Sequence, residues 1–285
     1  MIDGTYDCKP TLTDQQVIDF CGNGFLVLEA VVPDEVNRRT LGFLDKHPSP
    51  EPVEILDEDW FVEGVIKNPR AAGAVRSLLG KDLKLPKIMS NHRVECPRPL
   101  TGGWHRDGGA IDSVPLDVLQ VFYYPQDTPK EMGPTELVPS SHLLRIKRRF
   151  MTHYGTIRQG VRTAAPAGSI FITHYSIWHR ATTATAGGIR NLLKYQYWRT
   201  SAPERDWVMD PDLDFMQVKF RPDVQMAEKW YDSIHVARLF LWLCGLGARF
   251  EFKGGPCWPI TAGGGYRSTE GLPTGLDRRH DAVRV

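Results

Sequence analysis

The stretch GSIFITHYSIWHRATTATAGGIRNLLKYQYWR, residues 168–199, decides the fold class. It begins and ends with short runs of aromatic and β-branched residues, joined by a segment rich in glycine and threonine that we expect to form a turn. Similar runs, KIMSNHRVE, DVLQVFYYP and TELVP, precede it from residue 83 onward with no helical pattern between them. Several short strands in succession are typical of a β-sandwich or barrel, and we expect one here.

The segments on either side of this β region have the patterns of helices. In the N-terminal third, Thr13 and Gln16 have the spacing of a capping box, and Asn68 and Gly80 are start and stop signals for a second helix. GFLVLEAVV predicts one strand between them, and QMAEKWYDSIHVARLFLWLCG predicts a late helix.

We expect these segments to form one domain over residues 1–253. It would comprise a helical part (10–82), a β core (83–200) and a C-terminal helical segment (201–253). The glycine-rich tail, residues 254–285, is expected to be flexible or held only by a partner.

The composition excludes several classes of protein. A net charge of +1 over 285 residues argues against nucleic acid as the main partner, and no apolar run is long enough to span a membrane. The N-terminus lacks the apolar core of a signal peptide, and five scattered cysteines without a C-x-x-C pair fit a reducing compartment. We expect a cytoplasmic monomer or homodimer that acts on a small-molecule substrate.

The segment TGGWHRDGGAID, residues 101–112, places His105 two positions before Asp107. His-Arg-Asp also occurs in the catalytic loop of protein kinases, but the chain lacks the glycine-rich loop, strand lysine and Asp-Phe-Gly that a kinase needs. On a strand, residues i and i+2 point to the same side, so this pair could bind a metal together.

A third ligand would complete the 2-His-1-carboxylate triad of non-haem Fe(II) oxygenases. His179 is favoured because Arg190 follows on the next predicted strand, where a guanidinium could grip a carboxylate at two points. His174 stays open as the main alternative, while His142 is expected to cap a strand end. The histidines considered for this third ligand are His142, His153, His174 and His179.

The chain resembles the phytanoyl-CoA dioxygenase family of Fe(II)/2-oxoglutarate-dependent oxygenases. LTDQQVIDFCGNGFLVLEAVVPDE is similar to the family's opening helix-strand-helix, and WHRDGG to its His-x-Asp segment. MGPTELVPSSH is similar to its Pro-Gly-Ser-His segment, although Ser140 replaces the glycine. In the opening stretch, Arg190 follows the distal histidine by eleven residues, as it does in the family. The resemblance covers residues 10–200.

This resemblance implies a double-stranded β-helix, a jelly-roll core that is mainly β with flanking helices. It implies Fe(II) held by the triad, with 2-oxoglutarate as co-substrate and Arg190 on its far carboxylate. Thr135 and Tyr123 would lie beside the co-substrate, with Asn91 and Trp104 at the pocket wall and residues 52–65 and 106–118 as the lid. The expected iron ligands are His105, Asp107 and His179.

The implied activity uses O₂ to convert 2-oxoglutarate to succinate and carbon dioxide, with oxidation of an unactivated C–H bond. Hydroxylation or a related tailoring step of natural-product biosynthesis would be the outcome. Asp107 disfavours a halogenase, in which a small residue replaces the carboxylate ligand. Two alternatives stay open: a catalytically inactive jelly-roll binding or regulatory protein, and a metal-dependent isomerase of cupin type, which needs no Arg190.

Overall fold

The fold is described from a computed structural model of the chain. It describes residues 4–100, 102–107, 115–144, 154–157, 159–213, 218, 226–246, 250–252 and 266–268. Three expectations therefore lie wholly or largely outside the described residues. They concern His153, most of the proposed lid after Asp107, and most of the glycine-rich tail.

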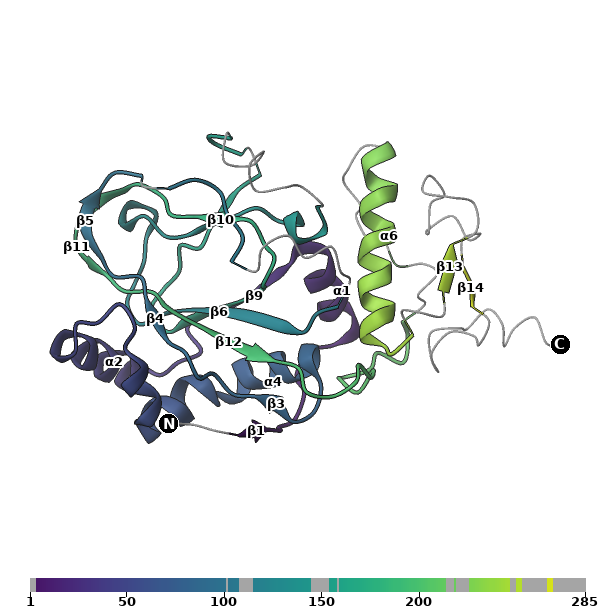
Figure 1. Ribbon diagram of the computed structural model, residues 1–285, viewed down its shortest axis with the longest axis horizontal. Helices are drawn as coiled ribbons and strands as arrows, with labels where there is room; N and C mark the ends of the chain where they lie inside the picture. The colour runs from purple at the N-terminus through teal and green to yellow at the C-terminus, as the bar shows by residue number, and fades with distance from the viewer. Residues whose placement is uncertain are drawn as a thin grey trace.

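The core is a large antiparallel sheet with a second layer of strands over one face (Figure 1). The order in the large sheet is β1 (Thr5–Tyr6), β3 (Leu83–Lys84), β12 (Leu193–Trp198), β6 (Val118–Tyr124), β9 (Ser169–His174) and β2 (Phe25–Leu28), with β4 (Ser90–Asn91) also paired to β12. The second layer holds β10 (His179–Arg180), β7 (Glu136–Leu137) and β8 (Val161–Arg162), and the pair β11 (Ala184–Arg190) with β5 (Val94–Arg98). This confirms the predicted jelly-roll class.

Helices cover the opposite face of the large sheet, and α6 stands beside α1 (Figure 1). The longer helices are α1 (Asp14–Asn23), α2 (Asp34–Lys46), α4 (Pro69–Leu79) and α6 (Met226–Leu243). The shorter helical turns are η1 (Val53–Asp57), α3 (Asp59–Phe61), η2 (Val62–Ile66), η3 (Lys130–Met132) and η4 (Ser141–Leu143). A separate two-stranded sheet is formed by β13 (Phe250–Phe252) and β14 (Tyr266–Ser268). The predicted capping box of α1 is present, as is the Asn68 cap of α4.

Alternation along β6 separates the two faces of the large sheet. Leu119, Val121 and Tyr123 belong to the main core cluster with the helices. Phe122 and Tyr124 belong to a second cluster between the two layers of strands. Because directly opposed residues of paired strands share a face, each neighbouring strand adopts the same division.

The segment predicted as a glycine- and threonine-rich turn is instead strand β11. It pairs with β5 from Ala184 to Arg190, with a register shift between Ala184 and Gly188. Glycine lowers the intrinsic strand preference, which is why the sequence pattern indicated a turn. Backbone hydrogen bonds to β5 stabilise this strand, although its small side chains favour strand structure little. A β-bulge at the register shift accommodates the residues between Ala184 and Gly188.

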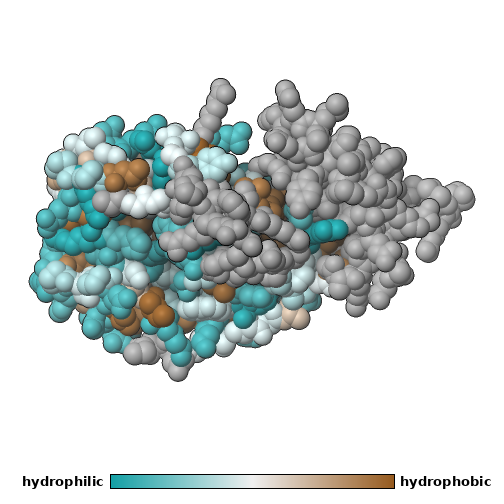
Figure 2. Space-filling view, turned by 45° about the horizontal axis from the view of Figure 1, so that its top comes forward, coloured by the Kyte–Doolittle hydropathy of each residue, from teal (hydrophilic) through white to brown (hydrophobic). Residues whose placement is uncertain are grey.

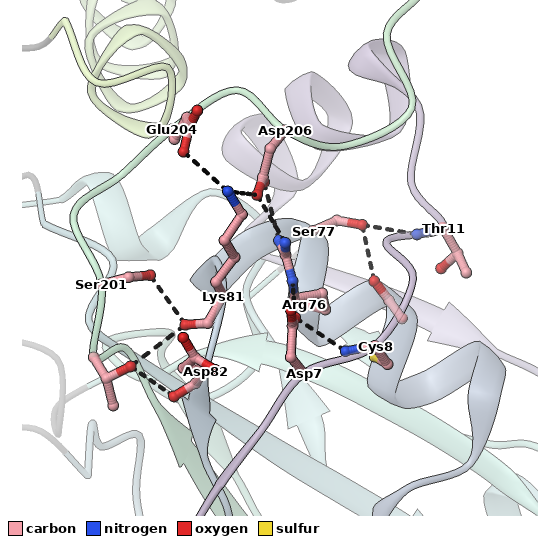
Figure 3. A network of polar contacts seen from close by, with 12 residues as sticks. Asp7, Cys8, Thr11, Arg76, Ser77, Lys81, Asp82, Ser201, Glu204 and Asp206 are labelled. Atoms are coloured by element: carbon pink, nitrogen blue, oxygen red, sulfur yellow. Dashed lines mark hydrogen bonds and ion pairs between the residues drawn. The ribbon is translucent and has the colours of Figure 1, made fainter.

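Two ion-pair networks fasten the helical layer to the segment after β12. Arg76 of α4 donates to Asp7 near the N-terminus (2.5 Å) and, through both terminal nitrogens, to Asp206 (3.0 and 2.8 Å), as Figure 3 shows. Ser77 accepts from the backbone N–H groups of Thr11 and Leu12, both at 3.0 Å. The N-terminal segment and the segment after β12 thus both contact α4.

The second network is centred on Asp14, which is fully buried at the start of α1. Its carboxylate accepts hydrogen bonds from Arg205 (2.8 and 2.5 Å), from the Trp207 indole (2.7 Å) and from the backbone N–H of Asp210 (2.6 Å). A buried carboxylate is tolerated where charged and neutral donors satisfy it in this way.

On the face seen in Figure 2, the described surface is mostly hydrophilic, with separate small hydrophobic patches. Within the described part of the chain, none of the helices combines the length and hydropathy needed to cross a lipid bilayer.

We predict that Asp14→Asn lowers the free energy of unfolding by about 3 kcal/mol, because the amide removes the buried negative charge that pairs with Arg205. Urea unfolding monitored by circular dichroism measures this. Asp19→Asn is the control, because Asp19 is exposed on the same helix and should change stability by less than about 0.5 kcal/mol. Equal stabilities for the two variants would contradict the account.

Candidate metal centre

Two histidines far apart in the sequence are joined through their backbones. His179 lies on β10, and His105 pairs with it in an isolated antiparallel bridge. Each backbone N–H donates to the other residue's carbonyl at 3.0 Å. The pairing brings the two imidazole rings to 4.3 Å between centroids.

Each imidazole is oriented by a carbonyl of its own loop. Nδ1 of His105 lies 3.1 Å from the carbonyl of Gly103, and Nδ1 of His179 lies 3.1 Å from that of Ile177. A carbonyl at this distance favours the tautomer with the proton on Nδ1, so that Nε2 is left as a lone-pair donor. Both Nε2 atoms face Asp107, at 3.7 Å from its Oδ1 and 3.4 Å from its Oδ2 respectively.

The three side chains form a cluster that could hold a metal ion, with one ligand atom from each within 4.8 Å of the others. The structure brings together the three residues that the sequence grouped. It differs in detail, since the backbone around His105 forms a single bridge and not a strand, and Asp107 lies in a turn. The side chains of His105 and Asp107 are 33% and 26% exposed, whereas His179 is 4% exposed, so the cluster opens on one side.

The electrostatics favour an ionised Asp107 and a neutral His105. Burial alone would raise the pKa of Asp107, but its contacts with His179 and the charged Lys194 lower it overall. Burial and the neighbouring His179 lower the pKa of His105. An ionised carboxylate and a neutral imidazole are the forms that bind a cation.

A buried arginine, Arg180, follows His179 on β10 and holds this strand in place. Arg180 donates to Glu136 on β7 (2.7 Å) and to the carbonyl of Gly155 (2.8 Å). Its guanidinium lies 4.4 Å from the centre of the Trp104 ring, whose indole N–H donates to the same carbonyl at 2.8 Å. Trp104 was expected at the pocket wall, but it packs in the layer behind β10.

A cavity of about 290 Å³ opens beside the two histidines and extends to Arg190. Arg190 donates to the carbonyls of Gly133 and His92, while its buried Nε has no hydrogen-bond partner among the described residues. Burial lowers the pKa of this guanidinium from its usual value. The cavity is lined by His92, Gly102, Gly103, His105, Phe122, Thr135, His179, Arg180, Ala181, Arg190, Leu192 and Lys194. Thr135 and Arg190 thus share the cavity with the histidines.

The structure corrects two other placements. The Tyr123 hydroxyl donates to Asn37 at 2.7 Å on the helical side of the sheet, because the alternation of β6 turns Phe122 toward the cavity instead. Asn91 is buried, but its amide is used structurally, donating to Asn191 (2.9 Å) and accepting from the backbone of Leu192 (3.3 Å).

Arg106, the first residue of the second segment expected to form the lid, is also buried. It donates to the carbonyls of Ser141 and Leu144, and its guanidinium lies 4.7 Å from the centre of the Trp178 ring. Its charge is therefore turned away from the neighbouring His105 and Asp107, as expected for the middle residue between two ligands.

The rival histidines lie outside the cluster. His142 is in the turn η4 and contacts the carbonyl of Cys21 through Nε2 at 2.9 Å. Its ring lies 4.9 Å from that of His174, which accepts a hydrogen bond from the backbone N–H of Ser176 (3.1 Å). Burial lowers the pKa of His174 to about 4, so it is a neutral, packed histidine.

Several cavity residues were missed by the sequence reasoning, and Lys194 is the most prominent. It continues the alternation that runs through Arg190 and Leu192, all three of which line the cavity. Gln120 lies on the same face, opposite Gln196 of β12; it is 1% exposed, and its amide has no hydrogen-bond partner in the described structure. Counting in steps of two from Arg190 would have found Lys194.

Solved structures of similar fold include three enzymes at low sequence identity. HygX from Streptomyces hygroscopicus, solved with nickel and 2-oxoglutarate, shares 16% identity over 67% of this chain and 88% of its own, with a TM-score of 0.56. The epimerase SnoN from nogalamycin biosynthesis shares 16% over 65% and 82% (TM-score 0.53), and the carbocyclase SnoK from the same biosynthesis shares 19% over 70% and 91% (TM-score 0.52). These likenesses show the fold.

A comparison with curated proteins finds no significant match. The sequence profile of the phytanoyl-CoA dioxygenase family matches residues 20–192, which is more than half of the chain. The matched segment includes the His105, Asp107 and His179 cluster and Arg190. The chain belongs to the phytanoyl-CoA dioxygenase (PhyH) family.

Proposed function

We propose that this protein is an Fe(II)- and 2-oxoglutarate-dependent dioxygenase that oxidises a C–H bond of a small organic molecule. The observation that carries the proposal is one cavity lined by a buried arginine and by both histidines of the His-Asp-His cluster. Family membership supports the same chemistry. Two further observations test whether the residues fit the metal and the co-substrate.

The donor set fits Fe(II). Two imidazole nitrogens and one carboxylate form the facial triad of non-haem iron oxygenases, which leaves coordination positions open for other ligands. The carbonyls of Gly103 and Ile177 accept from the Nδ1 side of each imidazole and so orient the rings, as carbonyls beside metal-binding histidines commonly do. We assign His105, Asp107 and His179 as the residues that would hold the ion.

The Arg190 side of the cavity fits a carboxylate. Its Nε is a buried donor with no hydrogen-bond partner among the described residues, and a buried donor left unpaired costs about 1–3 kcal/mol. A carboxylate of 2-oxoglutarate would remove that cost by a charge-assisted hydrogen bond. Thr135, beside Arg190 in the cavity, is the hydroxyl residue we assign to the same ligand.

Together, Fe(II) and 2-oxoglutarate supply the oxidation when bound, since O₂ then converts the co-substrate to succinate and carbon dioxide and a substrate C–H bond is oxidised. The chain orients the ligands through the His105–His179 backbone pair and excludes water from the buried side. Arg190 holds the co-substrate at a fixed distance from the metal ligands.

The substrate class we propose is a small natural product. HygX has been solved with hygromycin B, and SnoN with nogalamycin RO, both in similar folds. The inactive-protein alternative is disfavoured because the three potential ligands form one cluster, and Arg190 lines the same cavity as its two histidines. The cupin-type isomerase alternative gives no role to the buried, unpaired Arg190 nitrogen.

We predict that His105→Ala or His179→Ala weakens Fe(II) binding by about a hundredfold or more, because even second-shell changes cost about 10–100-fold. Release of succinate from 2-oxoglutarate should fall to background in the same variants. Anaerobic metal titration and a succinate assay measure the two effects. His47→Ala is the control, since His47 is exposed at the end of α2 and should change neither. Full activity in both ligand variants would overturn the assignment.

We predict that Arg190→Met weakens binding of 2-oxoglutarate to the Mn(II)-loaded protein by about a hundredfold while Mn(II) affinity is kept, because the variant removes one partner of a buried charge pair. Arg190→Lys should recover part of the loss, since it restores the charge without the planar fork. Isothermal titration calorimetry measures both affinities. Arg162→Met, an exposed change on β8, is the control. Unchanged 2-oxoglutarate affinity in Arg190→Met would favour the isomerase alternative.

A further inference from the structure

Lys194 contacts two of the three potential metal ligands through its ammonium group. Its Nζ donates to Oδ2 of Asp107 and lies 3.3 Å from Nε2 of His179. These are the atoms that the two residues would offer to a metal ion, since Oδ2 and Nε2 face each other at 3.4 Å. The Lys194 ammonium group therefore contacts the two atoms that would bind the metal ion.

The ammonium is held in this position by its surroundings. Lys194 lies on β12 opposite Phe122 of β6, and its Nζ is 5.4 Å from the centre of that ring. The side chain is only 11% exposed, so the charge is largely removed from water. Asp107 is the carboxylate with which it forms an ion pair in the described part of the chain.

One carboxylate cannot neutralise both cations. A divalent ion bound to Asp107 and an ammonium bound to the same residue repel each other at short distance, and the low-polarity surroundings strengthen the repulsion. Among the described residues, the acidic neighbours do not supply a second charge, because Glu136 is already paired with Arg180 and the described residues that line the cavity include no carboxylate. The ion and the ammonium are therefore competitors for one position.

We propose that Lys194 is a built-in competitor of the metal, whose ammonium stabilises the ligand set in the metal-free protein and is displaced when the ion binds. This inference rests on the proposed metal centre and adds a residue that sets its affinity. It makes metal loading weaker than the triad alone would allow, because binding includes the cost of breaking the Lys194–Asp107 pair. It also keeps the Asp107 carboxylate paired when no metal is present.

The test is a titration of Mn(II) into metal-free protein, with free Mn(II) followed by its electron paramagnetic resonance signal. Lys194→Met should bind Mn(II) at least about tenfold more tightly than the wild type, because the competing charge is gone. Lys194→Arg, which keeps a cation on the same strand, should stay close to the wild type. Lys46→Met removes an exposed charge on α2 and should leave the affinity unchanged.

Thermal unfolding gives a second readout that does not depend on turnover. Without metal, Lys194→Met should melt at a lower temperature than the wild type, because Asp107 has lost its cation. The rise in melting temperature on adding Mn(II) should be larger in the variant, as tighter binding to the folded state requires. If Lys194→Met does not fold, Lys194→Gln removes the charge with a polar side chain and replaces it in both measurements.

Two results separate failure of this inference from failure of the metal centre. Wild-type Mn(II) binding that is lost in His105→Ala, together with equal affinities in the wild type and Lys194→Met, would overturn the role of Lys194 alone. Absence of Mn(II) binding in both the wild type and Lys194→Met would overturn the proposed metal centre, and the competition with it.

Discussion

The reciprocal backbone pair between His105 and His179 is the interaction on which the site depends. The two N–H···O bonds, both 3.0 Å, join segments more than seventy residues apart and fix the spacing of the imidazoles before any ligand is present. The carbonyls of Gly103 and Ile177 then set each ring's orientation, and Arg180 holds β10 against β7. The cluster is preorganised by backbone geometry, so little ordering cost is left for ligand binding.

The jelly roll adds a second constraint, because alternate residues of each strand point to opposite faces of the sheet. Tyr123, Leu193 and their neighbours face the helices and form the main core. Phe122 and Lys194 face the opposite layer of strands and the cavity. Adjacent residues on one strand therefore face opposite sides of the sheet, one toward the core and the next toward the cavity. A residue next to a functional one can for this reason be purely structural.

Much of this arrangement could be predicted from the sequence, where local patterns are sufficient. The α1 capping box, the short strands and the spacing of His179 and Arg190 are all local signals. The strands predicted a β-sandwich or barrel, and the family resemblance implied the jelly-roll core and the four residues that share the site. What depends on distant partners could not be predicted. Strand β11 forms because β5 pairs with it, and Arg106 is buried because the η4 turn supplies its acceptors. Tyr123 faces the helices because strand alternation along β6 places it there, whereas the family resemblance had implied a place beside the co-substrate.

The central claim is that the cluster and Arg190 together bind Fe(II) and 2-oxoglutarate in one cavity. The most direct measurement is the visible absorption spectrum of the Fe(II)-loaded protein titrated with 2-oxoglutarate without oxygen, because chelation of Fe(II) by a 2-oxo acid produces a charge-transfer band. The account predicts that this band grows to saturation at one 2-oxoglutarate per protein and is missing in His179→Ala. A wild-type protein that binds Fe(II) and 2-oxoglutarate without developing the band would contradict it.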